Sequence, residues 1–184
     1  MAAEHLVFVD ESSTSIALTR RYARAPRGHR APGRVPRNQG TPTTLLAALS
    51  LDGLQATMTL PGAVNGASFT LYVREVLCPT LRPGQLVGLD NLSSHKGAAV
   101  RAAIEAVGCH LWFLPSYSPD FSPIEHTFSK LKAALRAVGA RTQDALDQAI
   151  AQAIDQVTPT DAHGWFTHCG YPPPSPLPPL AQAA

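Results

Sequence analysis

Cysteine is scarce in this 184-residue sequence, and its three cysteines, Cys78, Cys109 and Cys169, lie far apart without a CxxC pair. An odd number of widely spaced cysteines argues against a disulfide framework and favours reduced thiols in a cytoplasmic protein. No apolar run approaches the ~18 residues that a membrane-spanning helix needs. The first residues also lack the basic and apolar regions of a signal peptide, so we expect no membrane partner.

Charged residues are few as well, at 15% of the chain against 45% apolar residues, which excludes a disordered protein. The length predicts one domain with a substantial core, over residues 1–171. Residues 172–184 hold six prolines and are predicted to form a polyproline-like or disordered tail.

The net charge of +2 says little, but its distribution is uneven. Proline and glycine interrupt residues 20–37 repeatedly, which excludes one continuous helix and predicts an extended or looped basic arm. We expect this arm to pair with nucleic-acid phosphates, although a merely solvated basic loop is the alternative. Its seven arginines, among fifteen basic residues in the chain, are Arg20, Arg21, Arg24, Arg27, Arg30, Arg34 and Arg37.

The apolar pattern predicts an α/β fold in which a mixed central sheet carries helices on both faces. Strands are expected at residues 5–9, 43–51, 55–60, 85–90 and 109–114, with residues 15–19 as a candidate hairpin partner of the first. Helices are expected at residues 68–77, 97–107, 123–138 and 142–157.

Three acids stand where these elements begin or end. Asp10 and Asp90 each follow a short apolar run typical of a buried strand, and Glu125 lies in the first turn of a predicted amphipathic helix. Two strand-end carboxylates and one helical carboxylate can converge on a pair of divalent cations, the arrangement used for phosphoryl transfer on nucleic acid.

Each acid also has a plainer interpretation. Asp10 alone is as typical of a turn. Asn91 and His95, which follow Asp90, would orient a metal-bound water or a phosphate, or they belong to a polar turn. A Ser-His-Asp hydrolase is disfavoured because no Gly-x-Ser-x-Gly elbow surrounds the serines near His95. Residues 122–125 form a capping-box pattern that would explain Glu125 without any metal.

Lys130 and Lys132 follow Glu125 on the same predicted helix. Both are candidates for phosphate contacts, and a solvated helix face is the alternative. A zinc site formed by His163, His168 and Cys169 is disfavoured, because a fourth ligand at suitable spacing is absent from the sequence. We expect the neighbouring Trp165 and Phe166 to pack on the core instead.

Three segments together resemble a known family: Phe8-Val9-Asp10-Glu11, the stretch 89–96 (LDNLSSHK) and the stretch 114–125 (LPSYSPDFSPIE). They are similar to the DDE endonuclease core of mariner-type transposases, most closely to the bacterial insertion-sequence branch. The resemblance extends from residue 5 to residue 171. It implies an RNase-H-like fold in which Asp10, Asp90 and Glu125 bind two Mg²⁺ or Mn²⁺ ions.

The resemblance also implies hydrolysis at the ends of a transposon and attack of the exposed 3′-hydroxyl on target DNA. The partners implied are DNA and a second copy of the chain, in the bacterial cytoplasm at the nucleoid. Family members commonly carry a helix-turn-helix region that this sequence lacks before Asp10. We therefore expect a helix-turn-helix protein or fusion from an upstream frame. The alternatives are a stand-alone nuclease, such as a junction resolvase, and a non-catalytic DNA-binding remnant.

Overall fold

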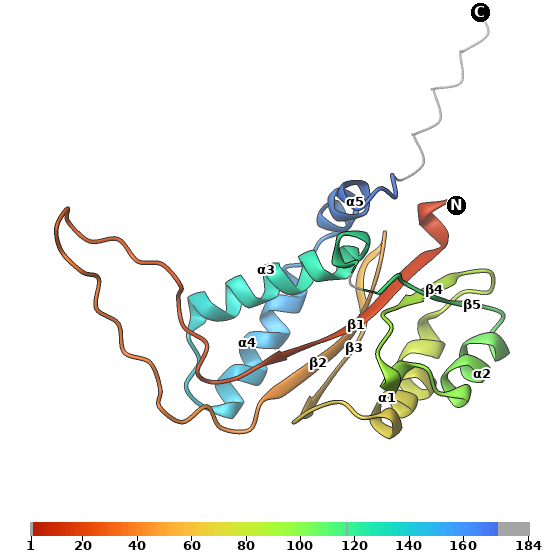
Figure 1. Ribbon diagram of the computed structural model, residues 1–184, viewed down its shortest axis with the longest axis horizontal. Coiled ribbons are helices and arrows are strands. Elements are labelled where there is room, and N and C mark those ends of the chain that lie inside the picture. The colour runs from red at the N-terminus through yellow and green to blue at the C-terminus, as the bar shows by residue number, and fades with distance from the viewer. Residues whose placement is uncertain (1, 117, 173–184) are drawn as a thin grey trace, which may run out of the picture.

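A five-stranded mixed sheet forms the centre of the protein (Figure 1). The computed structural model describes residues 2–116 and 118–172. The strands are ordered β3-β2-β1-β4-β5; β1 to β3 are antiparallel, and β4 and β5 run parallel to β1. Their bounds are β1 Leu6–Thr14, β2 Thr43–Ser50, β3 Gly53–Pro61, β4 Leu86–Leu89 and β5 His110–Phe113. The predicted mixed sheet is thereby confirmed.

Helices cover both faces of this sheet, as predicted. One face carries α3 (Pro123–Val138), α4 (Gln143–Asp155) and α5 (Pro159–His168). The other carries α1 (Gly66–Tyr72), continued by a π-helical turn at Val73–Leu77, and α2 (Ala98–Ala106). Short 3₁₀ turns lie at Ala3–His5, Cys78–Thr80, Ser93–His95 and Pro119–Phe121.

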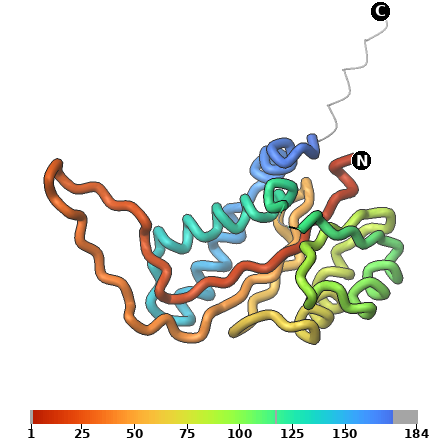
Figure 2. The backbone as a smooth tube through the Cα atoms, in the orientation of Figure 1, coloured from red at the N-terminus to blue at the C-terminus, as the bar shows by residue number. Residues whose placement is uncertain are grey.

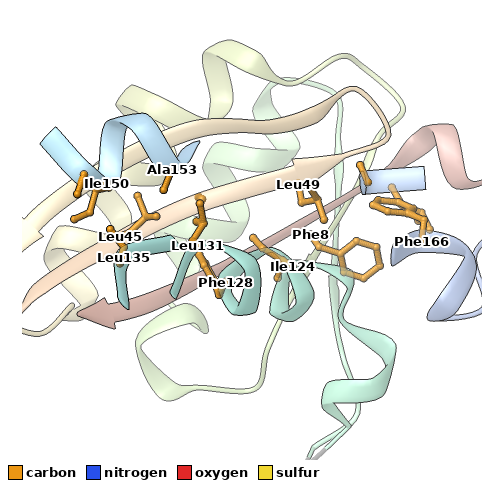
Figure 3. Packing of buried hydrophobic residues seen from close by; sticks show 14 of the residues in the cluster. Phe8, Leu45, Leu49, Ile124, Phe128, Leu131, Leu135, Ile150, Ala153 and Phe166 are labelled. Carbon is orange, nitrogen blue, oxygen red and sulfur yellow. The ribbon is translucent and has the colours of Figure 1, made fainter. Parts of the chain in front are cut away.

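Two separate cores result, because successive side chains of a strand point to opposite faces of the sheet. Phe8 of β1 packs on the α3 side with Ile124 and Phe128, as Figure 3 shows, whereas its neighbours Val7 and Val9 pack on the α1 side. The apolar stripe of α3 is fully buried here and sets the position of the first helical turn above the sheet.

The first strand is longer than its apolar run predicted. β1 continues past Val9 to Thr14, because its polar half pairs with the wholly buried β2, with Asp10 opposite Ala47 and Thr14 opposite Thr43. The expected hairpin partner at residues 15–19 was wrong: those residues form a turn and loop, and the partner is β2, across the arginine segment.

α5 was missing from the predicted elements, since Gly164 and few apolar residues weaken its pattern. It begins at a capping box in which Thr158 and Asp161 exchange hydrogen bonds. Phe166 is buried against Phe8, at 5.5 Å between ring centroids, so the expected core packing of this segment is confirmed. The predicted tail lies outside the described residues, apart from Pro172.

All three cysteines are free and buried. Within the described ranges, no helix combines the length and apolarity needed to cross a membrane.

Candidate active site

The pairing of the parallel strands β1 and β4 brings two of the predicted acids side by side. Leu6 pairs with Leu86 and Phe8 with Gly88, and the same offset continued by two residues sets Asp90 beside Asp10. Neighbouring strands lie only ~4.8 Å apart, so the two carboxylates share one edge of the sheet.

The third acid arrives from α3. Burial of Ile124 and Phe128 fixes the start of α3 over β1, and the exposed Glu125 then faces the strand ends. Asp10, Asp90 and Glu125 line one cleft of about 480 Å³, together with residues of the 114–122 loop. The three acids predicted from the sequence therefore border the same cleft.

Each aspartate uses one oxygen to hold the local fold and leaves the other free. Asp10 Oδ1 accepts a hydrogen bond from the Glu11 amide at 2.7 Å, and Asp90 Oδ1 accepts one from the Leu92 amide at 3.0 Å. Asp90 Oδ1 also lies 2.5 Å from His95 Nδ1. The second oxygens of both aspartates, and the Glu125 carboxylate, accept no hydrogen bond from the described residues.

Burial raises the pKa of Asp10 to about 7, opposed by the hydrogen bond from the Glu11 amide. Repulsion from Glu11, Glu125 and Asp90 raises it further. Because Glu125 and Asp90 both act on Asp10, it is the central acid of the cleft. An uncompensated carboxylate cluster of this kind favours a bound cation.

Asp90 behaves differently, because a cation already faces it. Burial raises its pKa, but the hydrogen bonds from His95 and from the Leu92 amide, together with the charges of His95 and Lys96, outweigh burial and lower the pKa of Asp90 overall. The His95 ring is fully buried; burial lowers its pKa, yet its contacts with Asp90 and Glu11 raise the pKa to about 9. His95 is thus an imidazolium at neutral pH.

The donor set fits a hard divalent cation, since Mg²⁺ and Mn²⁺ prefer carboxylate oxygens. The predicted convergence is looser than expected, however: among the described residues, no three His, Cys, Asp or Glu side chains are gathered closely enough to surround one ion. Glu125 stands exposed in the first turn of α3, where its side chain can rotate toward Asp10. This cleft therefore supports two pairs of carboxylates, Asp10 with Asp90 and Asp10 with Glu125.

The capping-box interpretation of Glu125 was wrong. Ser122 is the N-cap and Pro123 the first helical residue, as predicted, but no side-chain capping bond forms. The Glu125 amide instead donates to the Ser122 carbonyl at 3.1 Å. The Glu125 carboxylate is therefore not committed to the helix end.

The two lysines of α3 face different ways, because a helical residue turns ~100° from the one before it. Lys132 lies two turns from Glu125 on nearly the same face, beside Ser12 and Thr14 of β1. Lys130 points away from it, and its ammonium lies 2.6 Å from Asp161 and 2.9 Å from the Gln156 carbonyl. These contacts join α3 to α5 and correct the prediction that Lys130 binds phosphate.

Asn91 and His95 also differ from the prediction that they orient a metal-bound water or a phosphate. Asn91 lines the cleft, but its amide donates to the Leu114 carbonyl and so ties the end of β4 to the end of β5. His95 is fully buried, which excludes a phosphate contact and leaves it the task of orienting Asp90. Both ring nitrogens face carboxylates and not a serine, so a hydrolase triad is not assembled.

The arginine segment is the long loop that joins β1 to β2 and extends away from the body of the protein (Figures 1 and 2). It contains no helix or strand, and all seven arginines are exposed, which confirms the looped arm. Its base lies against the end of α3, where Arg20 donates to the Ala137 carbonyl at 3.4 Å. That point is roughly 20 Å along α3 from Glu125, at ~1.5 Å per residue.

Arg141 anchors this arm, which the sequence did not indicate. Its Nη1 donates to the Ile16 carbonyl at 2.9 Å and to the Leu18 carbonyl at 3.0 Å. We expect Arg141→Ala to speed tryptic cleavage of the arm roughly 3–10-fold while lowering the unfolding free energy by only about 1 kcal/mol. Limited proteolysis checks this, with the surface variant Arg101→Ala as control; equal rates in both variants would contradict the anchoring.

The disfavoured zinc site does not form. His163 and His168 are exposed while Cys169 is buried, and the His168 ring packs edge-on against His126 at 4.9 Å between centroids. The exposed histidines and packed Phe166 agree with the sequence analysis.

The sequence matches the DDE superfamily endonuclease family over residues 5–147. The chain belongs to this family. The matched range contains all three cleft acids. The insertion-sequence branch stays a prediction. A comparison with curated proteins found no match.

Solved structures of Mos1 transposase share the fold of this DDE domain. A pre-cleavage Mos1 transpososome matches with a TM-score of 0.74 at 18% identity, covering 90% of this chain and 54% of that chain. The Mos1 strand transfer complex matches at 0.68 and 19%, covering 91% and 51%. The catalytic domain of Mos1 mariner transposase matches at 0.65 and 17%, covering 90% and 79%.

These matches confirm the RNase-H-like fold that the resemblance implied. The chain spans about half the length of the Mos1 chains in the complexes. Other matching Mos1 structures are paired-end complexes with Mn and with Mg.

Proposed function

We propose that this DDE domain cleaves DNA and transfers the cut strand at the ends of an insertion sequence. One observation carries the proposal: carboxylates from β1, β4 and α3 line a single cleft in a chain of an endonuclease family. The matching Mos1 structures include pre-cleavage and strand transfer complexes, which supports both steps of the reaction.

Two Mg²⁺ or Mn²⁺ ions are the proposed cofactors, held by Asp10, Asp90 and Glu125. Bound there, they would activate the attacking oxygen and stabilise the leaving oxygen of a phosphodiester. Asp10 holds a proton near neutral pH that a cation would displace, and Asp90 is kept ionised by His95. Hydrolysis joins the oxygen of water to phosphorus and releases the 3′ oxygen as a hydroxyl. That hydroxyl then loses its proton, joins the phosphorus of a target phosphodiester and displaces the target's 3′ oxygen, which leaves as a hydroxyl.

DNA is the proposed partner, and its backbone would continue from the cleft along α3 to the arm. Lys132 lies on the path between Glu125 and the arginines, and Lys130 does not. The matching Mos1 structures include a transpososome and a paired-end complex, which supports a homodimer on two DNA ends. We propose that this dimer acts in the bacterial nucleoid. A helix-turn-helix partner or fusion from an upstream frame would supply recognition of those ends.

The arm makes a quantitative prediction for DNA binding. Replacing Arg24, Arg27 and Arg30 with glutamine removes three exposed charges whose side chains form no hydrogen bond or ion pair with the described residues. We expect the slope of log affinity against log salt to fall by about 2–3 units, because each phosphate contact contributes ~0.9. Fluorescence anisotropy at several salt concentrations measures it. An unchanged slope would remove the arm from the DNA interface.

A direct assay separates the proposed transposase from its two alternatives. The domain is mixed with Mg²⁺ and either DNA carrying the inverted repeats that flank its gene or random DNA. A transposase gives end-specific cleavage and strand transfer products, and a stand-alone nuclease gives cleavage alone. A DNA-binding remnant gives neither and would refute the proposal.

A further inference from the structure

Asp10 and Glu11 are neighbours in β1, and strand alternation sends their side chains to opposite faces of the sheet. Asp10 and Glu11 both border the cleft beneath α3, but the Glu11 carboxylate turns toward His95 on the α1 face. Glu11 keeps only 20% of its side-chain surface exposed. Its main chemical neighbour is a histidine and not the other acids.

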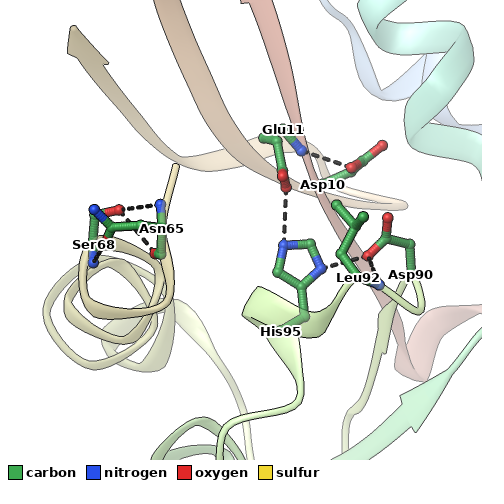
Figure 4. Close-up of polar contacts among 7 residues, drawn as sticks. All are labelled: Asp10, Glu11, Asn65, Ser68, Asp90, Leu92 and His95. Atoms are coloured by element: carbon green, nitrogen blue, oxygen red, sulfur yellow. Dashed lines mark hydrogen bonds and ion pairs between the residues drawn. The ribbon is translucent and has the colours of Figure 1, made fainter. Parts of the chain in front are cut away.

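His95 bridges two strands through its two ring nitrogens, as the dashed lines of Figure 4 show. Nδ1 lies 2.5 Å from Asp90 Oδ1, and Nε2 lies 3.0 Å from Glu11 Oε2. This second contact is an ion pair, and neither Nε2 nor Oε2 forms a hydrogen bond with any other described residue. The Phe69 ring packs on the imidazole, with centroids 4.0 Å apart and a tilt of 30°.

We propose that Glu11 is a positioning residue of the active site, which acts through His95 to hold the Asp90 carboxylate beside Asp10. This inference rests on the proposed metal-dependent function. A buried ring can carry a proton on both nitrogens only if each nitrogen faces an acceptor. Glu11 therefore fixes the orientation of the His95 ring, which in turn contacts the Asp90 carboxylate. One Asp90 oxygen then stays bound to His95 while the other stays turned to the cleft.

The arrangement gives the Asp10-Glu11 dipeptide two tasks. Asp10 offers its own oxygen to the cleft, and Glu11 sets the orientation of the acid on the neighbouring strand. Asp90 lies just after the end of β4 and is followed by a loop and a short 3₁₀ turn, so its backbone alone holds it less firmly than the centre of β1 holds Asp10. The Glu11–His95 contact supplies that missing restraint, as outer partners of metal ligands do.

Two variants of similar size test the proposal. Glu11→Gln removes the charge but keeps an acceptor for His95, and Glu11→Met removes both. We measure Mn²⁺ affinity of the DNA-free domain by electron paramagnetic resonance. Positioning predicts that Glu11→Gln binds Mn²⁺ within about 3-fold of the unsubstituted protein and that Glu11→Met binds at least 10-fold more weakly. Glu105→Met, on the exposed face of α2, serves as control and should bind normally.

If both Glu11 variants weaken Mn²⁺ equally, the charge itself acts, and the positioning role is refuted; unchanged affinity in Glu11→Met refutes it as well. Should Glu11→Met fail to fold, NMR of the unsubstituted protein decides. Two slowly exchanging His95 ring N–H signals that shift during Mg²⁺ titration support the role, and absence of the Nε2–H signal overturns it. These measurements need no DNA, so they are independent of the cleavage assay. If Glu11→Met binds Mn²⁺ normally while the domain cleaves DNA, the positioning role is refuted and the proposed function is retained.

Discussion

Glu125→Gln is expected to lower metal-dependent DNA cleavage by at least ~10³-fold, since it removes a carboxylate that would hold a divalent cation beside the reacting phosphate. The unfolding free energy should change by no more than about 0.5 kcal/mol, as for exposed substitutions elsewhere. We expect this small change in unfolding free energy because the Glu125 side chain takes no part in capping α3. Cleavage rates and urea unfolding of the same preparation measure the two effects.

The matched control is Glu105→Gln, which removes one charge from an exposed ion pair of α2, 3.2 Å from Arg101. That variant should cleave DNA normally. If Glu125→Gln instead unfolds the domain while the folded fraction stays active, Glu125 is structural and the third ligand is misassigned.

Asp10→Asn is expected to stabilise the metal-free domain at alkaline pH. The pKa of Asp10 is raised from 3.8 to about 7, so between these values the folded state binds more protons than the unfolded state. The corresponding stability is fully present below pH 3.8 and is lost as pH rises through about 7. Asparagine carries no charge into the cleft and escapes this loss.

The stability difference between Asp10→Asn and the unsubstituted protein should therefore grow by on the order of 2 kcal/mol from pH 5 to pH 8, after a discount for partial solvent contact. Urea unfolding with a chelator at both pH values measures it. His95 also loses stabilising charge as pH rises through about 9, but this occurs in both proteins and cancels. A constant difference across the pH range would show that Asp10 ionises normally. Adding Mn²⁺ should stabilise the unsubstituted protein more than the variant.

Helices with a strong apolar stripe and clear end signals were predicted closely. α3 begins at Pro123 and ends at Val138, as expected, and Gly139 terminates it in the left-handed conformation. α5 was missed, because its stability comes from Phe166 packing on Phe8 and not from a repeated local pattern. The second half of β1 was missed for a similar reason, since its polar residues are held by pairing with β2.

In the candidate site, too, local patterns were predicted and long-range contacts were not. The three acids were visible because Asp10 and Asp90 each follow a short apolar run and Glu125 lies in the first turn of an amphipathic helix. The roles of Lys130 and His95 were not, since both depend on partners far along the chain: Asp161 for the first and Glu11 for the second. Arg141 gave no local signal, because its contacts are with loop carbonyls.

The sequence by itself determined most of the elements and indicated the acids that we propose to carry the chemistry, because periodicity and acid placement are local properties of the chain. Only the tertiary structure decided that Glu125 is free of its helix cap, that Lys130 serves the helix interface and that Glu11 reaches Asp90 through His95. Those outcomes depend on the register of β1 with β4 and on the packing of α3. Both arise from contacts between residues distant in sequence, which local pattern does not encode.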